Sequence, residues 1–236
     1  VTGGSRGVGA ATAKMLSDNG WNVLITCSSS LAEAEIVAKK CSSKTAEVFA
    51  LQADVAKDTD CEATINMAVE KWGRIDALVN NAGTTKFAWD HSDLNSLDAN
   101  DFQYIYGVNV VGPFQMVKAA KEHLLRVTNS CVVNVSSIAG LKGIGSSLAY
   151  ASSKGALNTM TLSMARNLGP IRVNAVCPGF IEGEWLKKGM GPEMYEAAKL
   201  RVQTTTPLKQ TCTPESVAEV IVNLIEKSEL VTGQLV

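Results

Sequence analysis

The feature that most constrains the fold is an alternation of short apolar runs with longer stretches of helical spacing. Before and between the apolar runs, segments such as 8–20 and 150–169 carry apolar residues three and four positions apart, as amphipathic helices do. The runs themselves are short, rich in Val, Ile and Leu, and almost continuously apolar, which is typical of strands buried on both faces. They span residues 21–26, 47–53, 75–81, 131–137 and 171–179. The repeat predicts an α/β fold, a doubly wound parallel sheet with helices on both faces.

Length and charge narrow the function classes. With 236 residues, 46% of them hydrophobic, the chain fits one domain over residues 1–236. The 22 basic and 23 acidic residues give a net charge of -1 without long runs, so nothing favours nucleic acid or an anionic membrane as the main partner. No apolar run reaches the roughly twenty residues of a membrane span, and we expect a soluble protein that binds a small molecule.

The cysteines and the chain ends support two further expectations. The six cysteines form no C-x-x-C pair and no histidine completes a zinc spacing, so we expect no metal site, reduced thiols and a cytoplasmic location. The sequence opens with Val1 and Thr2 directly before a glycine cluster and closes on "LVTGQLV". Both ends therefore look cut inside strands, and we expect most of the first strand to be missing.

Polar and glycine clusters follow the predicted strands. "TGGSRGVG", "QADV", "NNAG", "VSS" and "CPGF" each stand where a strand is expected to end. In an open parallel sheet the ligand crevice lies beyond the carboxyl ends of the strands. The clusters should therefore meet in one crevice.

The first cluster has the composition of a phosphate-binding loop. If a helix begins near Val8, then Gly3, Gly7 and Gly9 lie in the turn before it. Their missing side chains would let a pyrophosphate approach backbone N–H groups and the helix N-terminus, as in a Rossmann-like dinucleotide-binding fold. The loop alone also fits a tight turn without a ligand. The residues expected to bind the cofactor here are Gly3, Ser5, Arg6, Gly7 and Val8.

A second cluster pairs Tyr150 with Lys154, four positions apart and so on one helix face. Ser137 stands thirteen residues before the tyrosine, at the end of a predicted strand. A free tyrosine has a pKa of about 10, and a neighbouring ammonium lowers that pKa by stabilising the phenolate. Taken alone, this spacing is most often a solvated helix face.

Together the motifs resemble the short-chain dehydrogenase/reductase family over essentially the whole chain. They are "TGGSRGVG", "NNAG" at 80–83, Asn109 in "GVNVVG", Ser137 in "NVSS", Y-x-x-x-K at 150–154 and P-G at 178–179, in this order. Within the family, the sequence is most similar to 3-oxoacyl-[acyl-carrier-protein] reductases and related ketoreductases.

The resemblance implies catalytic roles for four residues. Tyr150 would be the general acid that protonates the carbonyl oxygen as hydride arrives, and Ser137 would bind the same oxygen. Lys154 would lower the pKa of the tyrosine and donate to the nicotinamide ribose. Asn109 would hold a water that connects the lysine to bulk solvent.

Asn109 also has support from its own surroundings. Residues 101–125 have helical spacing, yet Gly107, Asn109, Gly112 and Pro113 interrupt it. Such a local conflict often marks a functional kink. The alternative is a helix bent merely to follow the sheet.

The remaining cofactor contacts follow from the resemblance. Asn81, Ala82 and Gly83 would let the adenine-side ribose lie against bare backbone, and Asp54, next to Val55, would accept from the adenine amino group. A helix cap at Asp54 and an ordinary turn at Gly83 are the alternatives. Pro178, Gly179 and Ile181 would border the nicotinamide. Gly183 stands where the family commonly has a threonine that contacts the carboxamide, so backbone atoms near Ile181 are expected to take over this contact.

The residues at the end of the predicted strand 21–26 favour NADP(H) over NAD(H). NAD normally needs a carboxylate there, but "ITCSSS" has no acid until Glu33. Ser28 and Ser29 can donate to a 2′-phosphate, and Arg6 can pair with it. A solvent-exposed Arg6 without a ligand is the alternative.

We therefore expect an NADPH-dependent reductase of ketones or aldehydes, with a carrier-bound 3-oxoacyl thioester as one candidate substrate. A non-catalytic dinucleotide sensor on the same fold is the alternative. The resemblance also implies a homotetramer and a substrate lid over residues 180–206, although that segment would also fit an ordinary amphipathic helix. His91 and His123 lie outside every cluster and are expected at the surface.

Overall fold

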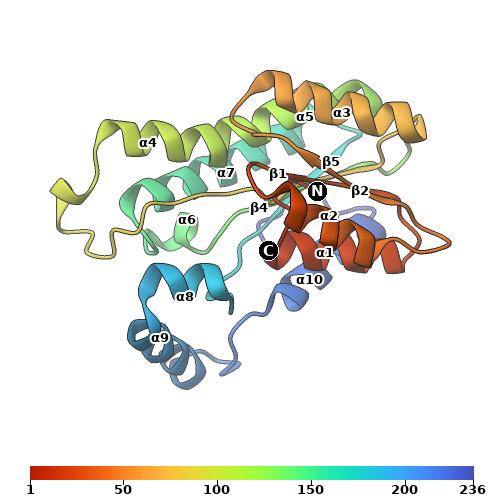
Figure 1. The fold of residues 1–236 in the computed structure, drawn as a ribbon. Helices are drawn as coiled ribbons and strands as arrows, with labels where there is room; N and C mark the ends of the chain where they lie inside the picture. The colour runs from red at the N-terminus through yellow and green to blue at the C-terminus, as the bar shows by residue number, and fades with distance from the viewer.

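The computed structural model describes residues 1–236. Strands and helices alternate along the chain as expected (Figure 1). The strands are β1 (Val23–Cys27), β2 (Val48–Gln52), β3 (Ala77–Asn80), β4 (Cys131–Val135) and β5 (Arg172–Val176). The helices are α1 (Gly7–Asp18), α2 (Leu31–Cys41), α3 (Asp58–Trp72), η1 (Leu94–Ser96), α4 (Ala99–Tyr106), η2 (Gly107–Val111), α5 (Gly112–Leu124), α6 (Ala139–Lys142), α7 (Leu148–Asn167), α8 (Glu184–Met190), α9 (Pro192–Thr205) and α10 (Pro214–Glu226).

The sheet is parallel, and the first residues of the chain hold its two parts together. β1 pairs with β2, and β4 lies between β3 and β5. Val1 donates its amino group to the carbonyl of Leu24 at 2.8 Å and accepts from the amide of Thr26 at 3.0 Å. Thr2 donates its amide to the carbonyl of Val79 on β3 at 2.9 Å. Residues 1–2 thus occupy the place of the expected first strand, between β1 and β3.

The chain end extends the opposite edge of the sheet. Leu235 forms a parallel bridge with Ala175 of β5, and the amide of Ala175 donates to the carbonyl of Gln234 at 2.8 Å. The order across the sheet is therefore β2, β1, residues 1–2, β3, β4, β5 and residues 234–236. This confirms the doubly wound parallel sheet that the sequence predicts.

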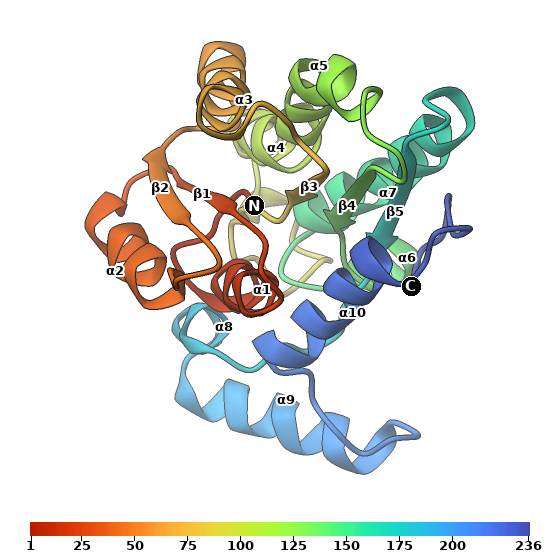
Figure 2. The same ribbon diagram turned by 90° about the vertical axis from the view of Figure 1, so that its right-hand side faces the viewer.

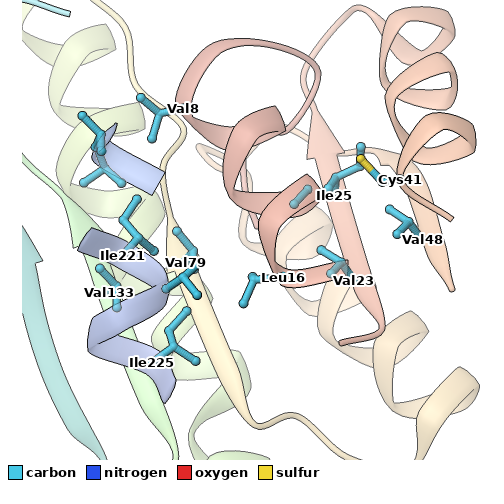
Figure 3. Close-up of a cluster of buried hydrophobic side chains, with 14 of the residues drawn as sticks. Val8, Leu16, Val23, Ile25, Cys41, Val48, Val79, Val133, Ile221 and Ile225 are labelled. Carbon is cyan, nitrogen blue, oxygen red and sulfur yellow. The ribbon is translucent and has the colours of Figure 1, made fainter. Parts of the chain in front are cut away.

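Helices cover both faces of the sheet, and each face has its own apolar core (Figure 2). Successive residues of a strand point to opposite faces. Val133 accordingly joins the cluster beneath α1, α2 and α10, drawn in Figure 3, whereas Val132 joins the cluster beneath α3 and α5. Burial on both faces explains why the strand sequences are continuously apolar.

The outer strand β2 departs from this pattern. β1, β4 and β5 are buried at every position, but in β2 only Val48 is buried and Gln52 is exposed. The expectation of a fully buried strand at 47–53 was therefore wrong. β2 lies at the edge of the sheet and pairs only with β1, a position that its apolar sequence does not reveal.

Residues 180–206 form two helices rather than one. α8 ends before Gly191, and Pro192 begins α9. No residue of α8 is buried, and Tyr195 is the only buried residue of α9, so neither is an ordinary core helix. The pair lies beside the body of the domain (Figure 2). No helix of the protein combines the length and the apolar character needed to cross a membrane.

Candidate active site

The glycine loop leads directly into α1, as the sequence predicts. Gly3 and Gly7 have φ angles of +64° and +55°, which residues with a side chain rarely adopt. A Cβ atom at Gly9 would lie 2.3 Å from the carbonyl oxygen of Gly3. Arg6 precedes the helix without capping it, and the first turn contains no acidic residue. The N-terminal amides of α1 are thus free to bind an anion, and the loop fits a dinucleotide pyrophosphate.

Asn81 holds this loop in place. Its side-chain amide donates to the carbonyls of Thr2 and Gly3, each at 2.9 Å. The backbone amides of Asn81 and Ala82 donate to the hydroxyl of Thr2, each at 3.0 Å. The "NNAG" motif therefore fixes the loop after residues 1–2 from the neighbouring strand. Sequence reasoning missed Thr2, although its position directly before the glycines was a usable signal.

Gly83 lies between two of the predicted catalytic residues. A Cβ atom at this position would be 3.5 Å from Oδ1 of Asn109 and 3.6 Å from Nζ of Lys154. The missing side chain thus leaves space beside the lysine amine. A glycine at this position therefore keeps space open beside Lys154 and Asn109, which the ordinary turn considered from the sequence would not require.

Asn109 lies in the expected kink, which is a π-helix. η2 separates α4 from α5, and Asn109 within it is completely buried. Its Oδ1 accepts from the amide of Thr84 at 2.8 Å, and its Nδ2 donates to the carbonyl of Thr84 at 2.9 Å and to Oγ of Ser153 at 3.0 Å. These contacts fix the asparagine between the segment after β3 and helix α7. Such π-helical turns are frequent at functional sites.

α7 carries Tyr150 and Lys154 on its first turns. Ser147 caps the helix by accepting from the amide of Tyr150 at 3.1 Å. Lys154 is buried and donates from Nζ to the carbonyl of Val135, at the end of β4, at 2.8 Å. No carboxylate pairs with this ammonium. Burial lowers the pKa of Lys154 to about 8.

The pKa of Tyr150 differs from the expectation. Burial raises it, and the side chain of Ser137 opposes that rise only in part. Lys154 was expected to lower this pKa, but its amine is bound to Val135 and lies 5.7 Å from the centre of the tyrosine ring. The prediction of a lowered pKa was therefore wrong for this structure. The phenol keeps its proton at neutral pH, as a proton donor must.

Asp54 and Val55 lie after β2. Oδ1 of Asp54 accepts from the amide of Ala56 at 3.0 Å, and the amide of Asp54 donates to Asp60 at 2.9 Å. The helix cap considered at Asp54 is not formed, because α3 begins only at Asp58. Val55 is buried against Gly112, where a Cβ atom would lie 2.8 Å from its side chain.

The residues expected near a 2′-phosphate are accessible. Ser28 and Ser29 follow β1 and are exposed, and the nearest acid along the chain, Glu33, lies in the first turn of α2. Arg6 is exposed and lines a hollow of about 260 Å³. The other residues around this hollow are Phe87, Glu184, Trp185, Lys188 and Gly189. Helix α8 thus comes close to the predicted phosphate loop.

The "PG" turn lies beside the loop that carries Ser137. The carbonyl of Pro178 accepts from the amide of Ile138 at 3.1 Å, and Gly179 also faces Ile138. Ile181 forms a parallel β-bridge with Cys212, so the two ends of the segment that contains α8 and α9 lie side by side. Gly183 follows directly, and a Cβ atom there would meet nothing within 4 Å. Space is therefore open here, but the φ of +156° at Gly183 is one that residues with a side chain rarely adopt, so the family's usual threonine would be strained in this conformation.

His91 lies nearer to the site than the sequence indicated. Its ring Nε2 is 3.1 Å from the carbonyl of Gly145, to which it donates because a carbonyl can only accept. Gly145 packs against the ring of Tyr150, where a Cβ atom would lie 3.6 Å from Cδ1. Sequence reasoning missed this contact because the two segments are far apart along the chain.

Comparison with known proteins agrees with this geometry. The family model described as short chain dehydrogenase matches residues 1–193. The chain belongs to the short-chain dehydrogenase family. As a short-chain dehydrogenase, it is an NAD(P)-dependent oxidoreductase that acts on CH–OH or C=O groups, with a nicotinamide dinucleotide as its cofactor.

Relatives of this short-chain dehydrogenase include ketoreductases and a sugar-alcohol dehydrogenase. A Streptomyces violaceoruber protein named as a ketoacyl reductase of the granaticin polyketide synthase is 39% identical, over 100% of this chain and 91% of its own length. The 3-oxoacyl-[acyl-carrier-protein] reductase of Staphylococcus aureus is 31% identical, over 100% of this chain and 94% of its own. The structure of an NAD+-bound xylitol dehydrogenase is similar with a TM-score of 0.89, at 25% identity, covering 100% of this chain and 94% of that one.

Proposed function

We propose that the protein is an NADPH-dependent carbonyl reductase in which Tyr150 is the general acid. One observation carries the proposal: the buried Lys154 and the half-buried Tyr150, with Ser137 and Asn109, gather at the carboxyl ends of β3 and β4 beside the open position at Gly83. A buried ammonium without a carboxylate partner is costly, so its retention argues for a functional role. A protein that only senses a dinucleotide would not need Ser137 and Tyr150 beside that ammonium, and the complete set therefore disfavours the non-catalytic alternative.

The chain has the cradle that a dinucleotide requires. The proposed contacts are the amides that begin α1 together with Gly3, Ser5, Arg6, Gly7 and Val8 at the phosphates, Asp54 and Val55 at the adenine, and Asn81, Ala82 and Gly83 at the adenine-side ribose. Pro178, Gly179 and Ile181 would border the nicotinamide. The bound cofactor supplies hydride to the carbonyl carbon. The protein supplies the proton and holds the carbonyl oxygen.

The proposed proton transfer uses groups with suitable protonation states. Tyr150 enters the reaction protonated, since burial raises its pKa, and donates its phenolic proton to the carbonyl oxygen. The hydroxyl of Ser137 donates to the same oxygen and stabilises its developing negative charge. Lys154, with a pKa of about 8, is mostly protonated at pH 7 and would donate to the nicotinamide ribose. Asn109 would position a water that returns a proton toward the lysine.

A preference for NADPH over NADH is part of the proposal. Ser28 and Ser29 are exposed hydroxyls at the end of β1, and Glu33 is held in α2 instead of at the strand end. Arg6, directly before α1, is the cation that would pair with a 2′-phosphate. Without a carboxylate at the strand end, the usual partner of the NAD ribose is missing.

A 3-oxoacyl thioester on an acidic carrier is the substrate class that we favour. Lys187 and Lys188 are exposed on α8, and the same helix carries the half-exposed Trp185. An acidic carrier could approach the two lysines, while an apolar acyl chain lies against the aromatic ring. Lys199, also basic, forms an ion pair with Glu182 at 2.7 Å and is less free to bind a partner. The names of the ketoreductase relatives agree with this choice.

We also propose a cytoplasmic homotetramer. Val111, Phe114 and Leu162 expose 42%, 50% and 39% of their surface on η2, α5 and α7. Exposed apolar side chains on neighbouring helices are typical of interaction surfaces.

The cysteines support the proposed cytoplasmic location. All six are free and five of them are buried, which suits a reducing compartment.

The experiment that tests the function is the substitution Tyr150→Phe. It removes only the phenolic hydroxyl, so fold and NADPH affinity should persist while turnover with a ketone falls by roughly 10²–10⁴. Steady-state NADPH oxidation gives the rate, and fluorescence titration gives the affinity. Turnover within about threefold of the wild type would refute the assignment of Tyr150 as the general acid.

A further inference from the structure

An irregular segment, residues 84–91, runs from the candidate active site to helix α8, and we call it the strap. It follows β3 without helix or strand of its own. Its first residue, Thr84, is fixed by Asn109 through two hydrogen bonds of 2.8 and 2.9 Å. The strap therefore starts beside Asn109, a proposed catalytic residue, and ends at His91.

One set of contacts ties the strap to the loop before α7. The hydroxyl of Thr85 bonds that of Ser146 at 2.8 Å, and the amide of Ala88 donates to the carbonyl of Ser146 at 2.7 Å. His91 donates to the carbonyl of Gly145 at 3.1 Å. Gly145 in turn packs against the ring of Tyr150.

Another set of contacts ties the strap to α8. Phe87 lies so close to Gly189 that a Cβ atom there would be 2.0–2.3 Å from three ring carbons. The indole nitrogen of Trp89 donates to the carbonyl of Gly189 at 3.2 Å. The ring of Phe87 also lies 5.4 Å, centre to centre, from both Trp89 and Trp185. Since α8 has no buried residue, these contacts are a main means of holding it in position.

We propose that the strap links the position of α8 to the position of Tyr150, with Phe87 packed on Gly189 at one contact and His91 bound to Gly145 at the other. Phe87 and His91 are thus positioning residues for the proposed carbonyl reduction, and this inference rests on that function. Movement of α8 away from Gly189 releases Phe87 and, through the same short segment, loosens the loop beside the general acid.

The first test is a double-mutant cycle at the contact between Phe87 and Gly189. Gly189→Ala favours a helix by intrinsic propensity, so helix stability alone predicts no loss. The proposed linkage predicts a loss of activity, because the added methyl group displaces the ring of Phe87. We expect kcat/KM for a neutral ketone to fall on the order of tenfold, since small misplacements at an active site are costly.

In a Phe87→Ala background, where the ring is gone, Gly189→Ala should change kcat/KM by less than about twofold. Gln203→Ala, at an exposed position of α9, is the matched control without effect.

A second readout does not depend on activity. Trp185 lies against Phe87, so Gly189→Ala should shift its fluorescence toward longer wavelength as α8 moves into solvent. The signal is isolated by subtracting the spectrum of the Trp185→Phe variant. If Tyr150→Phe kept full turnover, the proposed function would fail. The fluorescence shift would still decide whether the contact with Phe87 holds α8 in position.

The His91 contact is tested by a conservative pair. His91→Leu removes the donor to Gly145 and should lower kcat several-fold, while the dissociation constant for NADPH changes by less than about twofold. His91→Gln keeps an N–H donor and should restore most of kcat. Independent, additive effects of Gly189→Ala and Phe87→Ala, or an unchanged kcat in His91→Leu, would overturn the linkage.

Discussion

The buried ammonium of Lys154 makes a measurable prediction about stability. Its pKa falls from 10.5 to about 8 because burial removes the charge from water, which corresponds to a cost of roughly 3 kcal/mol in the folded state at neutral pH. Lys154→Met removes that charge. It also leaves the carbonyl of Val135 without its donor, which costs about 1–3 kcal/mol. At pH 7 the variant should therefore be as stable as the wild type or up to about 2 kcal/mol more stable, yet inactive.

The pH dependence separates the two contributions. Between the folded pKa of about 8 and the ordinary value of 10.5, the unfolded wild type binds more protons than the folded one. The stability contributed by this group therefore rises with pH across that window. The stability difference between Lys154→Met and the wild type should shift by roughly 3 kcal/mol in favour of the wild type from pH 7 to pH 10.5. The missing hydrogen bond to Val135 contributes equally at every pH.

The assay is urea unfolding followed by circular dichroism at several pH values for both proteins. The difference between them cancels the titrating groups that are not coupled to Lys154, among them Cys61 and Cys131, whose pKa values are raised. Cys177 does not cancel, because the ammonium of Lys154 lowers the pKa of its thiol, and a Cys177→Ala background removes this contribution. A difference that stays constant from pH 7 to pH 10.5 would show that Lys154 is not desolvated as described. A variant much less stable than the wild type at pH 7 would show that the contact with Val135 outweighs the cost of the charge.

Three further predictions concern cofactor, assembly and substrate. Ser28→Asp should weaken NADPH binding by placing a carboxylate near the 2′-phosphate, while NADH binds equally or better; a fluorescence titration in which the wild type already prefers NADH would contradict the cofactor proposal. Light scattering should find a tetramer, and Phe114→Asp should lower its order; a wild type that is only monomeric would exclude this assembly. Replacing Lys187 and Lys188 with glutamate should raise KM for a carrier-bound 3-oxoacyl substrate but leave a neutral ketone almost unaffected; identical effects on both substrates would remove the support for a carrier.

The fold class could be predicted from the sequence alone, and most residues of the candidate site were proposed from it. Continuous apolar runs at β1, β4 and β5 predicted strands buried on both faces, and the helical spacing between them predicted the parallel sheet. The glycines and proline around Asn109 predicted the interruption that is η2, because each residue disfavours a regular helix locally. These signals are local, so they can be read without knowing the neighbours in space.

Features that depend on residues far apart in the chain became visible only in the folded protein. Only pairing shows that β2 is an edge strand and that residues 1–2 lie between β1 and β3. The raised pKa of Tyr150 follows from its burial, and the amine of Lys154 is bound to Val135, which the four-residue spacing could not indicate. The strap likewise connects Tyr150 with α8 through contacts that span from about fifty to one hundred residues, such as His91 with Gly145 and Trp89 with Gly189. Desolvation and long-range packing arise from all neighbours together, so no local pattern in the sequence encodes them.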